Sequence, residues 1–190
     1  MKNLFLVIFV FLFVRLLYSS DLKNDSSLCN TPETHQFDFW IGEWNIDQKI
    51  IQRDGTWLET KAHTSVSPIL GGCALEEHWS GNVKFFWQGM DDIKPMKGFS
   101  IRYYNPKEKI WFIHWIDNFG LKLGHGMKGN FKDGRGEFFT ERDTPQGKQF
   151  SRITFSDIKE NSVHWELALS NDNKKSWITY WTMDMTKGKK

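Results

Sequence analysis

Residues 99–117 read FSIRYYNPKEKIWFIHWID. Two runs rich in β-branched and aromatic residues, 99–104 and 110–117, flank the turn-forming residues 105–109, which begin Asn-Pro. Such runs favour extended strands, and Asn and Pro favour a tight turn between them. This stretch therefore predicts an antiparallel β-hairpin.

The same alternation recurs on both sides of this hairpin, and every connector contains Gly, Pro, Asn or Asp. A longer loop is expected at 81–97, and no segment shows the 3.6-residue period of a helix. Further strands are expected at 39–52, 56–67, 74–80, 121–131, 136–142, 149–156, 163–170 and 177–185. The pattern thus predicts an all-β chain of about ten strands, joined mostly as hairpins.

Ten antiparallel strands in one sheet would leave two edges exposed. Closing the sheet into an up-and-down barrel removes both edges, which favours a barrel. A two-sheet sandwich is the competing arrangement.

Composition narrows the function classes. The chain has 190 residues, of which 16% are aromatic, and ten Trp exclude a disordered chain. Taking Lys2 and Arg15 of the first segment from the 25 basic residues leaves 23, against 23 acidic residues. A neutral chain argues against nucleic acid as a partner, and against an anionic membrane surface, because both need an excess of Lys and Arg.

The first twenty residues predict export. Lys2 precedes an apolar run, Leu4–Val14, which is shorter than the roughly 20 residues that span a bilayer. The expected organisation is a signal peptide at 1–20, a polar leader at 21–36 and a β-barrel domain at 37–190. This organisation predicts a secreted or periplasmic protein that has no stable membrane span after cleavage. An uncleaved membrane anchor is the alternative, since Leu17 or Tyr18 would stand where a signal peptidase prefers a small residue.

The chain has two cysteines, Cys29 and Cys73. In an exported protein such a pair favours a disulfide, which would tie the leader to the barrel. Two free thiols are the alternative.

Several motifs resemble those of DUF1579, a family of small exported domains of unknown function. They are Phe37-Asp38-Phe39-Trp40-Ile41-Gly42-Glu43-Trp44, Gly72-Cys73-Ala74-Leu75-Glu76-Glu77-His78-Trp79, and the spaced residues Trp111, Trp115, Asp117 and Gly120. The resemblance covers residue 33 to the C-terminus and implies a lipocalin-like or calycin-like barrel. The family has no established activity, so it implies no catalytic residue.

A barrel of this size can hold one small ligand, and its aromatic content suits an apolar cavity. We therefore expect a small hydrophobic or amphipathic molecule as partner. The residues expected to form its walls are Trp79, Tyr104, Trp111 and Trp115, and those expected to anchor its polar part are Glu77, Arg102 and Asp117. A solid aromatic core is the alternative.

Glu77 alternates with Leu75 and Trp79, so it is expected to face the interior, and Asp117 shares a face with Trp115. A buried carboxylate needs a partner, and Arg102 or Arg152 would supply one. Such a centre would orient a ligand or form a structural ion pair. An enzyme using Glu77 or Asp117 as general base is an alternative function.

A third function is an interaction module. Both faces of residues 110–117 are apolar, so the leader, a loop or a second copy in a homodimer would cover the outer one.

Metal and cofactor signatures are weak. His114, Asp117 and His125 could approach one another, but the first two should point to opposite faces of one strand. No nucleotide-binding or hydrolase motif occurs. No metal site and no cofactor is therefore expected, with haem on a buried His as a minor option.

Overall fold

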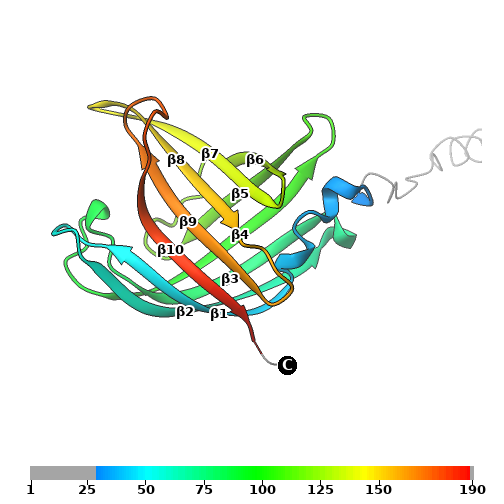
Figure 1. Cartoon of the computed structure of the whole chain (residues 1–190), viewed down its shortest axis with the longest axis horizontal. Coiled ribbons are helices and arrows are strands. Elements are labelled where there is room, and N and C mark those ends of the chain that lie inside the picture. Colours follow the sequence, from blue (N-terminus) through cyan, green and yellow to red (C-terminus); the bar gives the residue numbers. More distant parts are fainter. Residues whose placement is uncertain (1–28, 189–190) are drawn as a thin grey trace, which may run out of the picture.

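The computed structural model describes residues 29–188 and contains a single closed barrel of ten antiparallel strands (Figure 1). The predicted signal peptide and the first part of the leader, up to residue 28, lie outside the described residues. The strands are β1 (Gly42–Ile51), β2 (Trp57–Ile69), β3 (Ala74–Val83), β4 (Lys94–Asn105), β5 (Ile110–Asp117), β6 (Met127–Lys132), β7 (Arg135–Thr144), β8 (Gly147–Ser156), β9 (Ser162–Ser170) and β10 (Ile178–Lys187).

Each strand pairs with its neighbours in sequence, and β1 pairs with β10 to close the barrel. The closing ladder joins Trp44 to Lys187 at one end and Ile50 to Trp181 at the other. The backbone amide of Gly188 extends this ladder by donating to Glu43 O over 2.8 Å. The predicted all-β up-and-down barrel is confirmed, and the sandwich alternative is excluded.

The loop expected at 81–97 is shorter than predicted, because β3 continues to Val83 and β4 already begins at Lys94, with η5 (Phe86–Gln88) between them. Two further strand boundaries differ from the prediction for local reasons. Strand β1 starts at Gly42 rather than at residue 39, because η3 (Asp38–Trp40) forms a 3₁₀ turn there. Gly42 then adopts a φ of +124°, which favours glycine, so the chain can bend from this turn into the strand. Strand β6 begins at Met127 rather than at residue 121, because residues 118–126 form a loop.

One end of the barrel is closed by residues 29–41, which include η2 (Pro32–His35) and η3, drawn in blue in Figure 1. Phe37 is fully buried there, with ring centroids 4.9 Å from Trp111 and 4.8 Å from Phe131. Cys29 is bonded to Cys73, with their Cα atoms 4.7 Å apart. The bonded pair fixes this segment, which we call the plug, to the barrel.

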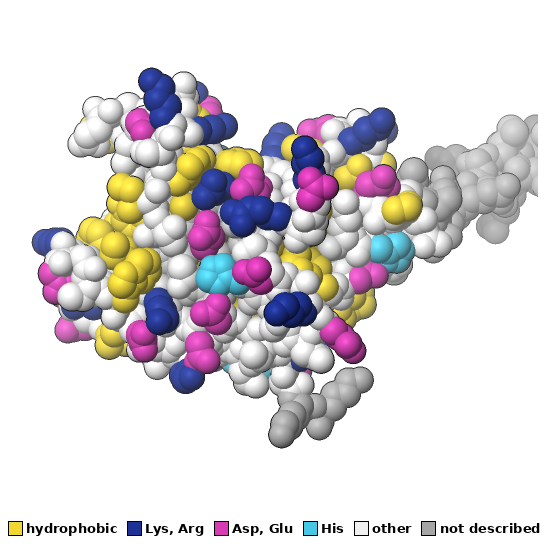
Figure 2. Space-filling model, in the orientation of Figure 1, with side chains coloured by type: hydrophobic (Ala, Val, Ile, Leu, Met, Phe, Trp, Pro, Cys, Tyr) yellow, Lys and Arg dark blue, Asp and Glu magenta, His cyan; other side chains and the backbone are white. Residues whose placement is uncertain are grey.

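The opposite end carries the β1–β2, β3–β4, β5–β6, β7–β8 and β9–β10 connections and has no plug among the described residues. Strands β5 and β6 pair over only three residue pairs, so the wall thins beside this open end. Hydrophobic side chains gather toward it in the space-filling view (Figure 2). The large apolar residues exposed there are Trp57, Ile93, Phe119, Leu121, Leu123 and Ile178.

No helix within residues 29–188 is both long enough and apolar enough to cross a membrane.

Candidate functional site

The interior holds a cavity of about 300 Å³ between the plug and the open end. The side chains that alternate inward along the strands line it, and most of them are apolar. Six indoles line it, those of Trp40, Trp79, Trp87, Trp115, Trp165 and Trp181. The cavity therefore has the apolar aromatic lining expected of a ligand pocket.

The indoles support one another in the wall. The Trp181 ring lies 5.7 Å from that of Trp79 and 5.2 Å from that of Trp165, both in edge-to-face geometry. Its Nε1 donates to Gln48 Oε1 over 2.8 Å, and Gln48 is almost fully buried. Edge-to-face packing and a satisfied indole nitrogen fix the orientation of this ring.

The position of the Trp115 ring depends on a glycine in the neighbouring strand β4. A Cβ atom added to Gly98 would lie 1.9 Å from the Trp115 ring. Glycine at this position lets the indole lie directly over β4. Any larger residue would push the ring out of the wall.

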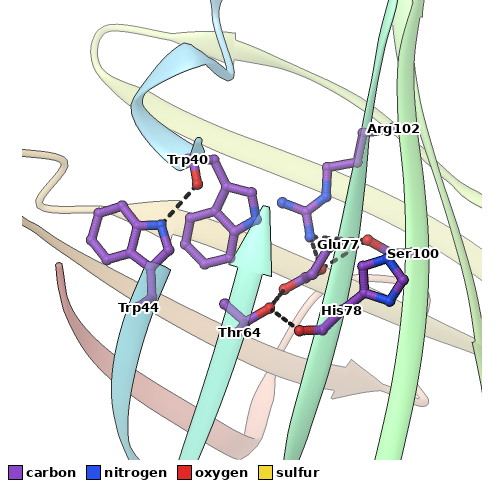
Figure 3. Close-up of polar contacts among 7 residues, drawn as sticks. All are labelled: Trp40, Trp44, Thr64, Glu77, His78, Ser100 and Arg102. Atoms are coloured by element: carbon purple, nitrogen blue, oxygen red, sulfur yellow. Dashed lines mark hydrogen bonds and ion pairs between the residues drawn. The ribbon is translucent and has the colours of Figure 1, made fainter. Parts of the chain in front are cut away.

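A buried polar cluster marks the inner part of the cavity next to the plug (Figure 3). Glu77 accepts hydrogen bonds from Thr64 Oγ1 (3.0 Å) and Ser100 Oγ (2.8 Å), and it forms an ion pair with Arg102. The Glu77 and Arg102 side chains are 6% and 5% exposed, so water screens the pair little. The predicted inward direction of Glu77 and its pairing with Arg102 agree with this geometry.

Aromatic rings surround the Arg102 guanidinium. Its central carbon lies 5.2 Å from the Phe37 ring, 5.1 Å from the Trp40 ring and 5.5 Å from the Phe155 ring. Burial lowers the pKa of Arg102, and the negative charge of Glu77 opposes that shift. The ring faces and Glu77 together stabilise the cation inside the barrel.

Asp117 lies at the open end of the cavity and has no arginine partner. Its Oδ2 accepts from Trp115 Nε1 (2.9 Å), and its Oδ1 accepts from the amides of Phe119 (2.9 Å) and Gly120 (2.8 Å). These bonds turn the chain after β5, which explains why residues 121–126 do not continue as a strand. The expected pairing of Asp117 with Arg102 or Arg152 is therefore replaced by a turn.

Arg152 pairs elsewhere. Its Nη2 lies 3.3 Å from Glu166 Oε1, and its guanidinium covers the Trp177 ring at 4.6 Å.

Tyr104 and Trp111 lie apart from the cavity. Trp111 is buried against Phe37 of the plug, and its Nε1 donates to Gln36 Oε1 over 3.1 Å. Tyr104 lies beside it, 5.9 Å between ring centroids. The structure thus brings Glu77, Trp79, Arg102, Trp115 and Asp117 to the cavity lining and places these two aromatics at the closed end.

Sequence reasoning did not assign several lining residues to the site. Trp40 was part of a quoted motif, but its position beneath the cavity depends on the plug. The alternation of Val163, Trp165 and Leu167 on β9 was a usable signal for Trp165. The shared face of Trp181, Met183 and Met185 on β10 was another, and all three line the cavity.

The outer face of β5 is covered by its own neighbours. Phe112 stacks on Tyr103 (5.2 Å), and Lys128 lies 4.7 Å above the Phe112 ring. His114 shares this outer stack, 6.0 Å from Tyr103, and so it points away from the cavity that Asp117 lines. Within residues 29–188 no three His, Cys, Asp or Glu side chains are grouped to hold a metal ion.

Comparisons with known proteins bear on the fold. No family model matches the chain, and no curated protein matches it. Membership of DUF1579 therefore stays a prediction.

Solved structures do resemble it. An S-type phycobiliprotein lyase from Guillardia theta superposes with a TM-score of 0.51 at 9% identity, over 81% of this chain and 91% of that chain. A protein of unknown function from the DUF3598 family, from Nostoc punctiforme, aligns over 83% of this chain and 100% of that chain at 6% identity, but its TM-score of 0.26 supports no argument. At such identities the likeness concerns the fold alone, and together with the ten-strand topology it supports a calycin-like barrel.

Proposed function

We propose that this protein binds a small apolar or amphipathic molecule inside its barrel and does not transform it. The observation that carries the proposal is the cavity of about 300 Å³, lined by six indoles and closed by the plug at one end. Its volume lies at the lower end of the roughly 300–1,000 Å³ that ligand pockets occupy. The phycobiliprotein lyase from Guillardia theta has a similar fold, and a ligand-holding role in this chain is in keeping with that likeness.

The contacts of the two carboxylates favour binding over acid–base catalysis. Glu77 accepts from Thr64 and Ser100 and pairs with Arg102. Both oxygens of Asp117 are also engaged, by Trp115 and by backbone amides. Every oxygen of the two carboxylates thus accepts at least one hydrogen bond from the protein, which supports a structural anchoring role over that of a general base directed at a substrate proton.

The interior also favours binding over a solid structural core. Close-packed interiors contain few voids larger than a water molecule. This cavity is about ten times the roughly 30 Å³ share of one water in the liquid.

We further propose that the ligand enters at the open end and that the protein is exported. The thin β5–β6 seam and the exposed apolar residues at that end support the route. The bonded cysteine pair supports a secreted or periplasmic location, because such bonds persist in oxidising compartments.

The test is binding of N-phenyl-1-naphthylamine, an uncharged fluorophore, to the full chain and to two variants of β8. Ser151→Phe adds a ring at a lining position, whereas Ser156→Phe adds the same ring outside the lining. Overpacking costs about 1–3 kcal/mol, so Ser151→Phe should weaken binding about tenfold or more while Ser156→Phe binds like the parent. Equal affinities in both variants, or no binding by the parent protein, would contradict the proposal.

A further inference from the structure

The cavity wall contains hydrogen-bond donors that the described protein leaves without acceptors. They are Trp40 Nε1, Trp79 Nε1, Arg102 Nε and Arg102 Nη1, all buried. All three residues line the cavity. An unpaired buried donor costs about 1–3 kcal/mol. Four such donors around one cavity therefore favour an occupant that accepts hydrogen bonds.

Two of these donors belong to side chains that pack against each other, Trp40 and Arg102. Figure 3 draws the Trp40 indole beside the Arg102 guanidinium, and no marked contact reaches the Trp40 nitrogen. The Arg102 central carbon is 5.1 Å from the Trp40 ring, which confirms that the groups are close. The aromatic faces around Arg102 stabilise its charge but offer these N–H groups no oxygen or nitrogen acceptor. A ligand acceptor that reached Trp40 Nε1 or Arg102 Nη1 would therefore satisfy a donor that the protein itself leaves unpaired.

Charge excludes an anion at this position. The ionised side chains that line the cavity are Arg102, Glu77 and Asp117, so their formal sum is negative. Arg102 is already neutralised by Glu77. A carboxylate bound beside this pair would be a buried charge without a counter-charge, whereas a carbonyl oxygen would gain the same donors at little desolvation cost.

We propose that the ligand is an uncharged molecule with a carbonyl group, held by Arg102 and Trp40, and an apolar body that runs past Trp79 toward the open end. This inference rests on the proposed function and names its ligand class. Trp79 Nε1 is a further unpaired donor in the cavity wall. A second hydrogen-bond acceptor in the apolar part of the ligand could therefore be bound there.

The experiment compares decane, 2-decanone and decanoate as competitors of N-phenyl-1-naphthylamine on the full chain. The three share a chain length and differ in the head group. We expect 2-decanone to bind about tenfold more tightly than decane, as a hydrogen bond to a charged donor provides, and decanoate to bind more weakly than the ketone. The infrared carbonyl band of bound 2-decanone should lie below its position in hexane, because a hydrogen-bonded carbonyl is weakened.

Variants locate the contact. Trp40→Phe removes a donor that has no acceptor in the described protein and keeps an aromatic ring, so it should lower the preference for ketone over alkane. Trp181→Phe is the matched control, because its Nε1 is already bonded to Gln48, and it should change the affinities for both probes alike. The infrared band reports the carbonyl directly even where a variant binds less tightly.

The outcomes separate the two proposals. Equal binding of decane and 2-decanone, as when water already satisfies the donors, overturns the carbonyl inference and leaves the cavity function standing. Tighter binding of decanoate overturns the uncharged ligand class. Failure of every probe to bind, the fluorophore included, overturns the proposed function itself.

Discussion

The two ends of this barrel place the same residue types in opposite environments, since large apolar side chains are buried at the closed end and exposed at the open end. At the closed end, Phe37, Trp40, Trp44 and Trp111 are at most 2% exposed. Phe37 packs edge-to-face on Trp111, and Trp40 stacks on Trp44. At the open end, Phe119 and Leu121 are 38% and 78% exposed. The closed end thus supplies a packed base that holds the Glu77–Arg102 cluster. The open end leaves apolar surface exposed around the entrance to the cavity.

The largest expected difference between the ends is in core packing. Phe37→Ala should lower the free energy of unfolding by about 3–5 kcal/mol, because it empties the centre of the plug. Phe119→Ala removes the same side chain at the open end and should cost far less, because that ring is partly in solvent. Urea denaturation measures both, and similar losses would show that the ends are not packed differently.

The polar cluster next to the plug should be nearly as sensitive. Arg102→Met leaves the buried Glu77 carboxylate without a counter-charge and should cost about 3–5 kcal/mol of stability. The double variant Glu77→Gln with Arg102→Met should recover much of this loss. Lys61→Met, which breaks the exposed pair with Asp47, is the control and should have a much smaller effect. A single variant as stable as the control would mean that the cluster contributes little.

The bond between Cys29 and Cys73 should matter somewhat less, and mainly to the closed end. It joins residues 44 apart, and removing such a bond costs about 2–4 kcal/mol. Cys29→Ser with Cys73→Ser should therefore lower stability and raise amide hydrogen exchange in residues 30–41, with little change around the β9–β10 loop. Mass spectrometry of exchanged peptides would show it, and uniform exchange across both ends would refute this local effect.

The smallest effect is expected in the β9–β10 turn at the open end. Hydrogen bonds, first from the Ser176 hydroxyl and amide and then from Ser170, hold the pKa of Asp172 well below its usual 3.8. A depressed pKa stabilises the fold above about pH 4, and this contribution disappears as the pH falls toward the folded-state pKa. Asp172→Asn should thus lower the urea midpoint slightly near neutral pH, and the gap should narrow in acid. A gap that widens in acid would contradict this sign.

Strand order and hairpin pattern could be predicted because they depend on local alternation. The expected strand 110–117 coincides with β5, since its aromatic and β-branched residues and the Asn105-Pro106 turn favour only one arrangement. The β9–β10 turn is local in the same way, because Asp172 Oδ1 accepts from the Lys175 and Ser176 amides. Each of these features is decided within a few residues.

The cavity could be predicted only in part, because its two ends depend on contacts between distant residues. Glu77, Trp79 and Trp115 followed from alternation, but both faces of β5 are apolar and nothing local separates Trp111 from Trp115. The plug gives them different positions. Phe37 packs against Trp111 at the closed end, whereas Trp115 lies farther toward the open end and lines the cavity. Trp40 was missed for the same reason, since a 3₁₀ turn before β1 sets its place.

The closure between β1 and β10 has a consequence for biosynthesis. Nine of the ten ladders join strands adjacent in sequence and can form as the nascent chain lengthens, whereas the tenth joins residues 44–50 to residues 181–187. Until the last strand has paired, the β1 edge has no partner of its own and is free to pair with another copy of the chain. Pairing of these final residues with β1 therefore protects the protein against domain-swapped and aggregated forms.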